Sequence, residues 1–257
     1  MNCMLGNRKR TPETFTTLTT LTDSSPTNLT ELKEKGGLKE VYFAPGEKIC
    51  PEIIKNLSKL NSEKGKKGHN WYVQSLKKLF RNYQEKADKK SKTSKTSHLF
   101  FVGFIVGEGS VNVSAKKSCF SRFGIVLDPE FSVSQHINGM SHLLYALQLF
   151  KTGTIRYKSG SNATFLFRID NRKSLSEKCI PFLERYCAPY ASEAWQKRLC
   201  TFNNLLHLFQ EKAHLTEKGF INQMLPLWDR LRKQRKQKNS SFCILLQAQQ
   251  YAKNSIK

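Results

Sequence analysis

Residues 101–110 read FVGFIVGEGS, and this stretch decides how the rest of the chain is interpreted. Gly103 and Gly107 are four residues apart, so an apolar helix through them presents both glycines on one face. Glycines on a helix face let a second backbone approach closely, although each costs about 1 kcal/mol of helix propensity. A single carboxylate, Glu108, ends the stretch. If two copies packed through the glycine face, the two carboxylates would lie side by side.

Strands with one polar face are predicted on both sides of residue 120. Polar and apolar residues alternate from Ser110 to Lys116 and again over residues 121–134, which is the period of a half-exposed strand. A hairpin follows, with a turn at residues 159–161 and the same alternation on both sides of it. Helices are predicted over residues 134–150 and over about residues 192–213 and 216–238. Another helix is predicted to start at a capping box formed by Ser174 and Glu177 and to run towards Cys187. The fold class is therefore α+β, with an αββαββα order from residue 98 and a four-stranded antiparallel sheet.

The charge of the chain indicates a polyanionic partner. Its formal net charge is +23, and nucleic acid is the usual partner of so basic a protein. Residues 31–96 carry 17 Lys and Arg against 8 Asp and Glu, and residues 172–257 carry 16 against 6. Residues 97–171, with 7 against 4, are nearly balanced. The flanks would hold phosphates, whereas the centre would read base edges.

Several other classes of protein are excluded. The seven cysteines include no CxxC pair, so neither a zinc module nor a disulfide framework is indicated. The chain has no HExxH motif and no Walker A loop, which argues against a zinc protease and an ATP-driven helicase. The apolar run over residues 99–107 is far shorter than the roughly 20 residues that span a bilayer. No membrane partner is expected.

Three segments are predicted. Residues 1–37 form a threonine-rich leader that we interpret as disordered, with a weaker similarity to an organelle transit peptide. Residues 38–97 form a basic helical extension, in which Pro51 suits the first turn of a helix. Residues 64–68 are predicted to be a linker, and residues 84–97 a charged linker. Residues 98–257 form the main domain with its basic C-terminal helices.

The motif and several longer segments resemble a known family. FVGFIVGEGS resembles the LAGLIDADG motif of the homing endonucleases, and the αββαββα order resembles their core fold. Only one copy of the motif is present, as in the homodimeric branch of the family. Within that branch the chain most resembles the kind of endonuclease encoded by a chloroplast large-subunit rRNA intron of green algae. The resemblance runs through residues 123–140, 149–165 and 168–182, and more weakly through 45–61 and 224–234. It covers about residues 42–257.

The resemblance implies roles for individual residues. Glu108 takes the place of the catalytic acid and, with Gly107, that of the metal ligands. Gly103 and Gly107 take the places of the small residues at the dimer interface. Gln135 matches a position that orients active-site water, and Lys197 or Arg198 is the candidate for the catalytic basic residue. Val106 departs from the family by replacing a second acid that is not a metal ligand. The polar positions that would bind DNA are Asn112, Ser114, Lys116, Arg122, Asp128, Ser132, Arg156, Lys158, Asn162, Thr164 and Arg168.

The implied function is a site-specific DNA endonuclease of intron homing. Two adjacent Glu108 carboxylates need a divalent cation between them, and Mg²⁺, with Mn²⁺ as a substitute, suits carboxylate, phosphate and water ligands. The resemblance implies a homodimer that cuts both strands of a long pseudo-palindromic target in an intronless large-subunit rRNA gene, leaving short 3′ overhangs. It also implies a chloroplast location, with the mitochondrion as the alternative. An intron RNA maturase of the same fold, which would bind intron RNA without cutting DNA, is the alternative function. A structural DNA-binding protein is a third.

Overall fold

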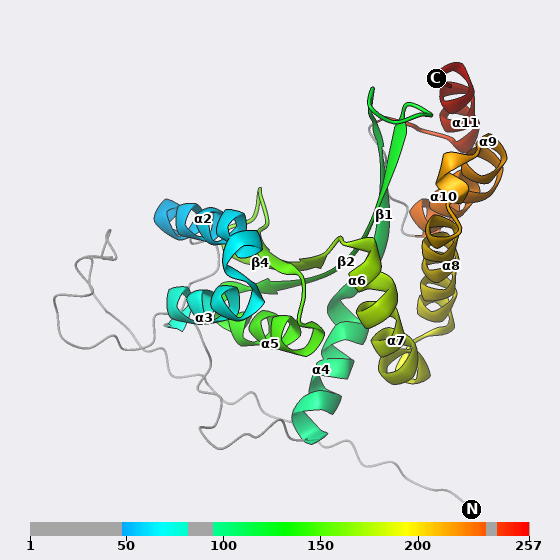
Figure 1. Ribbon diagram of the computed structural model, residues 1–257. Helices are drawn as coiled ribbons and strands as arrows, with labels where there is room; N and C mark the ends of the chain where they lie inside the picture. The colour runs from blue at the N-terminus through cyan, green and yellow to red at the C-terminus, as the bar shows by residue number, and fades with distance from the viewer. Residues whose placement is uncertain (1–47, 82–94, 235–240, 257) are drawn as a thin grey trace, which may run out of the picture. The chain divides into compact units, whose positions relative to one another are not determined.

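The computed structural model describes residues 48–81, 95–234 and 241–256, all of which lie in one compact unit, Glu40–Lys257. The predicted leader and most of the predicted charged linker lie outside the described residues. The predicted α+β class and αββαββα order are confirmed (Figure 1). The elements of that core are α4 (Lys95–Glu108), β1 (Gly109–Lys117), β2 (Ile125–His136), α5 (Met140–Phe150), β3 (Thr154–Tyr157), β4 (Thr164–Ile169) and α6 (Arg172–Ser174).

Further helices flank the core on both sides in the sequence. The N-terminal pair is α2 (Pro51–Lys67) and α3 (His69–Leu79). Beyond α6 the chain continues as a helix with π-type turns through η3 (Leu175–Cys179), α7 (Ile180–Phe182) and η4 (Leu183–Cys187) to the 3-10 turn η5 (Ala188–Tyr190). The C-terminal elements are α8 (Glu193–Gln210), η6 (Ala213–Leu215), α9 (Glu217–Gly219), η7 (Phe220–Met224), α10 (Leu225–Gln234) and α11 (Leu245–Asn254).

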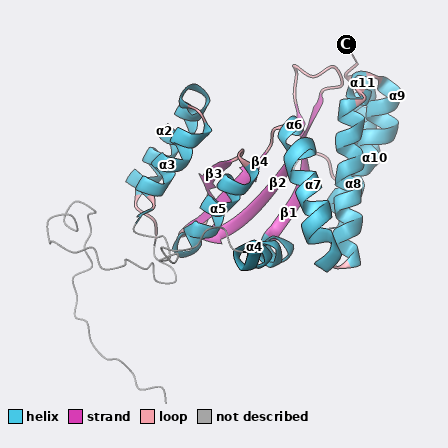
Figure 2. Ribbon diagram, turned by 60° about the horizontal axis from the view of Figure 1, so that its bottom comes forward, coloured by secondary structure: helices cyan, strands magenta, loops and turns pink. Residues whose placement is uncertain are grey.

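The four strands form one antiparallel sheet in the order β1-β2-β4-β3. Its apolar face is buried by helices: α5 packs on β2 and β4, while α8 and α10 pack on β1 (Figure 2). Phe131 and Phe167, on adjacent strands, both contact the ring of Phe150 from α5, with ring centroids 5.7 and 6.0 Å apart. All three side chains are almost fully buried. Because these large aromatic side chains are buried on one face, the alternate residues of each strand must lie on the opposite, outward face.

Several predicted boundaries are wrong. Residues 118–124 form the turn between β1 and β2 rather than the start of a strand, and Gly124 there has a positive φ of 65°. Ser134 and Gln135 belong to β2, because they pair with β4, and a 3-10 turn, η2 (Ile137–Gly139), precedes α5. The helix after β4 is capped by Asn171, whose side chain accepts a hydrogen bond from the N–H of Ser174, so the predicted Ser174 capping box does not start it.

The N-terminal helices pack against the edge of the sheet. The predicted linker at residues 64–68 is mostly the last turn of α2, and only Gly68, with φ 84°, separates α2 from α3. α2 contacts β3, the edge strand, and α3 contacts α5. Phe80, just after α3, is fully buried and meets the ring of Phe165 on β4 at 5.1 Å. The predicted extension is therefore packed onto the same core as the motif helix.

The C-terminal helices support the long β1–β2 hairpin near its turn. Phe123 stacks on Phe220 of η7 with ring centroids 5.0 Å apart. Arg122 donates a hydrogen bond to the carbonyl of Leu215 at 2.8 Å. The ammonium of Lys117 lies over the ring of Tyr251 on α11, 4.9 Å from its centroid. A two-stranded ribbon is marginally stable alone, so these contacts hold the hairpin in place.

Candidate nucleic-acid interface and active site

One face of the sheet carries the polar side chains, and we call it the polar face. The register places Ser110 opposite Ser132, and Ser132 opposite Arg168, which in turn faces Thr154. Because strand residues alternate between faces, every residue of the same parity joins this set. The polar face comprises Ser110, Asn112, Ser114, Lys116, Asp128, Glu130, Ser132, Ser134, His136, Thr154, Arg156, Thr164 and Arg168, with Val126 and Leu166 as apolar members. None of the helix contacts described above falls on these residues. The twisted polar face can therefore enter a groove as wide as the major groove of DNA.

Most of the predicted DNA-binding residues are brought together on this face. Three of them lie instead in the turns at the ends of the two hairpins. Arg122 is exposed in the β1–β2 turn, where it contacts Leu215. Lys158 and Asn162 are exposed in the β3–β4 turn, and the carbonyl of Asn162 accepts a hydrogen bond from the N–H of Ile49. These residues therefore border the polar face rather than belonging to its strands.

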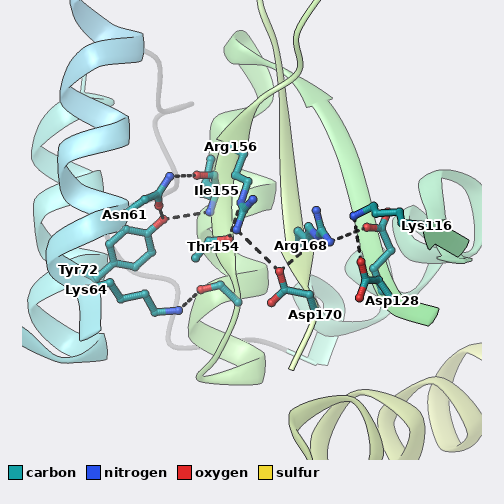
Figure 3. A network of polar contacts seen from close by, with 12 residues as sticks. Asn61, Lys64, Tyr72, Lys116, Asp128, Thr154, Ile155, Arg156, Arg168 and Asp170 are labelled. Atoms are coloured by element: carbon teal, nitrogen blue, oxygen red, sulfur yellow. Dashed lines mark hydrogen bonds and ion pairs between the residues drawn. The ribbon is translucent and has the colours of Figure 1, made fainter. Parts of the chain in front are cut away.

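Ion pairs link the charged side chains of the polar face (Figure 3). Arg168 lies 3.1 Å from Glu130 and 3.4 Å from Asp170, and Arg156 lies 3.7 Å from Asp170. Lys116 pairs with Asp128 at 2.9 Å. The sequence interpretation missed Glu130 and Asp170. The alternation that placed Asp128 and Ser132 on the polar face also places Glu130 there, so the signal for it was present.

Glu108 is exposed at the junction of α4 and β1. A Cβ at Gly109 would lie 2.4 Å from the carbonyl oxygen of Ile105, so only glycine lets the strand leave the helix this tightly. The last carbonyls of a helix carry a partial negative charge, and the Glu108 carboxylate adds to it. This end of α4 is thus an electronegative point at the end of a sheet in a strongly basic chain.

Gln135 emerges at the same end of the sheet as Glu108. The register pairs Gly109 with Val133, and Gln135 follows two residues later. Its side chain has the parity of the apolar face, packs over Gly139, and accepts a hydrogen bond from the N–H of His136 through Oε1 at 2.8 Å. Placing Gln135 near the acid is in keeping with the predicted role, which remains a prediction.

Lys197 and Arg198 have different surroundings. Lys197 lies on the exposed face of α8, paired with Glu193 at 2.6 Å. Arg198 is buried and donates to the carbonyl oxygens of Val111 at 2.8 Å and Leu231 at 2.6 Å. Those bonds tie β1 to α10, so Arg198 has a structural role. Lys197 is the freer of the two to act on a bound nucleic acid.

The α4 helix has one buried face and one exposed face. Phe101, Val102 and Ile105 are buried, whereas Leu99 and Phe100 are 50% and 61% exposed. Gly103 and Gly107 lie on the exposed side, and a Cβ added to either would meet no atom within 4 Å. The fold of one subunit therefore gives no reason for glycine at these two positions. An apolar helix face with two such glycines suits close packing against a second helix.

A metal ion would have few ligands from one subunit. Among residues 48–81, 95–234 and 241–256, no three His, Cys, Asp or Glu side chains gather as a metal-binding group. Glu108 is the carboxylate at the end of α4, and the Gly107 carbonyl is next to it in sequence. Mg²⁺ is commonly held by one or two carboxylates together with phosphate oxygens and waters. These residues fit such an ion provided that other ligands come from a second subunit and from the substrate.

Comparisons with known proteins identify the family. The model of the LAGLIDADG endonuclease family matches residues 101–192. The DNA endonuclease I-CeuI of Chlamydomonas moewusii is 45% identical over 218 residues, covering 84% of this chain and 97% of that protein. The chain belongs to the LAGLIDADG endonuclease family. The resemblance inferred from the motif is therefore confirmed, and so is the fold that it implied.

Solved structures of LAGLIDADG endonucleases have the same fold. The group I intron-encoded homing endonuclease I-CeuI, complexed with DNA, matches with a TM-score of 0.75 and 43% identity, covering 82% of this chain and all of that one. The archaeal intron-encoded homing endonuclease I-Vdi141I, also complexed with DNA, matches with a TM-score of 0.56, 24% identity and coverage of 63% and 98%. The second likeness concerns the fold alone. The helices α2, α3 and α8–α11 lie outside the residues that the LAGLIDADG model matches.

None of the helices in the described part of the chain has the length and apolar character that a membrane span requires.

Proposed function

We propose that this chain is a site-specific double-strand DNA endonuclease that acts as a homodimer. The carrying observation is the position of Glu108, an exposed acid where the open glycine face of α4 meets the first strand of the polar face. A second copy packed on α4 would bring two acids together at the twofold axis, with a DNA-binding sheet on either side. The relatives reported above, which are DNA endonucleases or are bound to DNA, support this activity.

In the proposed reaction the protein positions one phosphodiester of each strand near the two acids. The polar faces of both subunits bind base edges in the groove, and the basic flanks bind phosphates. Glu108 and the Gly107 carbonyl would hold a divalent cation, Gln135 would orient water, and Lys197 would offer positive charge to the phosphate. Mg²⁺, or Mn²⁺ in its place, would supply activation of the attacking water and stabilisation of the leaving oxygen. Because the subunits share the site, each strand is cut once and the break is staggered.

The substrate and location follow from the family resemblance. We infer a long pseudo-palindromic target in an intronless large-subunit rRNA gene, short 3′ overhangs, and action in the chloroplast rather than the mitochondrion. An intron RNA maturase of the same fold is not favoured, because the relatives are named as DNA endonucleases and splicing has no need of the Glu108 carboxylate.

The test is cleavage of a plasmid that carries the intronless large-subunit rRNA gene. Purified protein with Mg²⁺ should linearise it, and sequencing of the ends should show one staggered cut. A matched plasmid in which the intron interrupts the gene should stay intact. Failure to linearise the first plasmid, by protein that binds its DNA, would contradict the endonuclease proposal. Splicing of the intron RNA by the same preparation would then favour the maturase.

A further inference from the structure

Carboxylates on the polar face require an explanation if this face binds DNA. Glu130 lies on β2, and Asp170 directly follows β4 with the same parity as Arg168. The β2–β4 register, which pairs Phe131 with Ile169, brings Glu130 and Asp170 to adjacent positions across the two strands. Two acids placed together repel each other and also repel phosphates. Their position therefore opposes the electrostatic attraction that the rest of the chain creates.

The side chain of Arg168 lies between these two acids. Its Nη2 atom is 3.1 Å from Glu130, and its Nε atom is 3.4 Å from Asp170. The Arg168 and Glu130 side chains are each 21% exposed, so solvent screens this pair less than it screens a surface ion pair. β4 is an inner strand of the sheet, which further restricts the arginine. The guanidinium is thus held through its Nε and Nη2 atoms, while Nη1 takes no part in either ion pair.

Asp170 also connects Arg168 to Arg156 on the neighbouring strand. Arg156 Nη2 is 3.7 Å from Asp170 Oδ2 (Figure 3). Arg156 faces Leu166 across the β3–β4 ladder, so Arg156 and Arg168 are diagonal neighbours. Diagonal residues on adjacent strands lie ~7–8 Å apart, a distance at which two unpaired guanidiniums would repel. The shared carboxylate keeps both arginines on the polar face.

We propose that Glu130 and Asp170 are positioning residues for base recognition, and that they hold Arg168 as a preformed base-reading side chain. The proposal rests on the proposed function, in which the polar face binds DNA. A guanidinium that is already oriented loses less conformational freedom when it meets a guanine edge. The two carboxylates also disfavour a phosphate at the same place, so the arginine selects base edges over the sequence-independent backbone.

The test measures base preference and affinity separately. The affinities of wild type and Arg168→Ala are first measured for a set of cognate duplexes that each carry one changed base pair. The pairs whose change weakens binding of the wild type but not of Arg168→Ala are the Arg168-dependent pairs. Asp170→Asn and Glu130→Gln should then lose preference at those same pairs by about fivefold or more, since the oriented bidentate contact carries the discrimination there. Both variants should bind a scrambled duplex more tightly than the wild type, because each removes a negative charge. Asp170→Glu should restore part of the preference.

Glu177→Gln is the matched control. It removes the same charge, but Glu177 lies outside the polar face, where it pairs with Lys173 at 3.9 Å. It should leave preference at the Arg168-dependent pairs unchanged. Thermal unfolding of every variant shows whether loss of stability accompanies any change.

The remaining outcomes separate failure of the proposed function from failure of this inference. If the wild type does not distinguish cognate from scrambled DNA, the proposed function fails. If the wild type does distinguish them and both variants keep the full wild-type profile, this inference fails while the proposed function stands. A parallel loss of affinity for both duplexes, or the same loss of preference in Glu177→Gln, would also overturn the positioning role.

Discussion

The hydroxyl of Tyr72 on α3 accepts a hydrogen bond from the backbone N–H of Ile155 on β3 at 3.0 Å. It also donates to Oδ1 of Asn61 on α2 at 2.5 Å, and Nδ2 of Asn61 donates to the carbonyl of Ile155 at 3.0 Å. Lys64 donates to the carbonyl of Gly153, just before the strand. Side chains from the N-terminal helices thus occupy the outer backbone groups of an edge strand (Figure 3). They block pairing with another chain and fix the strand that carries Arg156.

Tyr72→Phe should therefore destabilise the protein. The substitution leaves the buried N–H of Ile155 without its acceptor, which costs about 1–3 kcal/mol of the free energy of unfolding. Urea denaturation measures that loss, and hydrogen exchange should show that the Ile155 amide becomes less protected. In a double-mutant cycle, Asn61→Ala and Tyr72→Phe should be strongly non-additive, because they break one network. Additive losses would show that the two side chains act independently.

The same tyrosine predicts a loss of stability in alkali. Burial raises the pKa of Tyr72 from 10.0 to about 12. Because the folded state holds its proton more tightly, the contribution is fully present below pH 10 and is lost as the pH rises towards 12. The shift corresponds to about 3 kcal/mol. Burial also raises the pKa values of the Cys179 and Cys187 thiols, which act with the same sign. The tyrosine contribution is the difference in the free energy of unfolding between wild type and Tyr72→Phe, which should shrink as the pH rises from 10 towards 12.

Glu108→Gln should abolish cleavage while binding stays within about tenfold of wild type. The carboxylate is needed for the cation, whereas affinity comes mostly from phosphate contacts spread over both flanks. The variant should also be as stable as the wild type or more stable, since an acid at a helix C-terminus is unfavourable by roughly 0.3–1 kcal/mol. Cleavage assays, gel-shift titrations and thermal unfolding measure the three effects, with Glu177→Gln as the surface control. Wild-type cleavage by Glu108→Gln would remove this residue from the mechanism.

Gly103→Leu should leave each subunit folded but prevent dimer formation and cleavage. A Cβ added at Gly103 has open space around it within its own subunit, so we expect the loss to come from a clash with a second chain. Light scattering gives the oligomeric state, and circular dichroism the fold. Gly65→Leu on α2 is the matched control, because Gly65 is also a helical glycine with open space around it. An active monomer of the wild type would contradict the proposed interface.

The strands were predictable where a local pattern specified them. Period-two alternation placed Asn112, Asp128 and Arg168 on one face, since the apolar parity must be buried. Strand ends were less predictable: Gln135 continues β2 because it pairs with Phe165, about 30 residues away in sequence. Lys197 and Arg198 could not be distinguished, because adjacent helix positions point about 100° apart and only packing against β1 decides which is buried. The partners of Tyr72 depended on the same kind of long-range contact.

Side chains that contact bases should be distinguishable from those that contact phosphates by how their variants bind cognate and scrambled duplexes. Arg156 is 50% exposed on the polar face, so Arg156→Ala should weaken binding mainly of the cognate duplex, by about 1–3 kcal/mol if it contacts guanine. The basic run that begins at Arg230 belongs to the C-terminal flank, which was predicted to hold phosphates. Arg232 is not available for this role, because its side chain is 13% exposed and pairs with the buried Asp229 at 2.6 Å. Residues 235–240 lie outside the described residues.

Arg230 is exposed, whereas Lys233, although also exposed, pairs with the buried Asp229 at 2.7 Å. Arg230→Gln should weaken binding of cognate and scrambled duplexes alike. The salt dependence of binding should also fall, by about one unit of slope for each phosphate that the variant no longer binds. Titrations of both duplexes at several salt concentrations make the comparison. Arg232 and Lys233 should be left intact, because both pair with the buried Asp229 and help to keep its pKa low against the effect of burial. If Arg156→Ala weakens both duplexes equally, the polar face does not read sequence through this side chain.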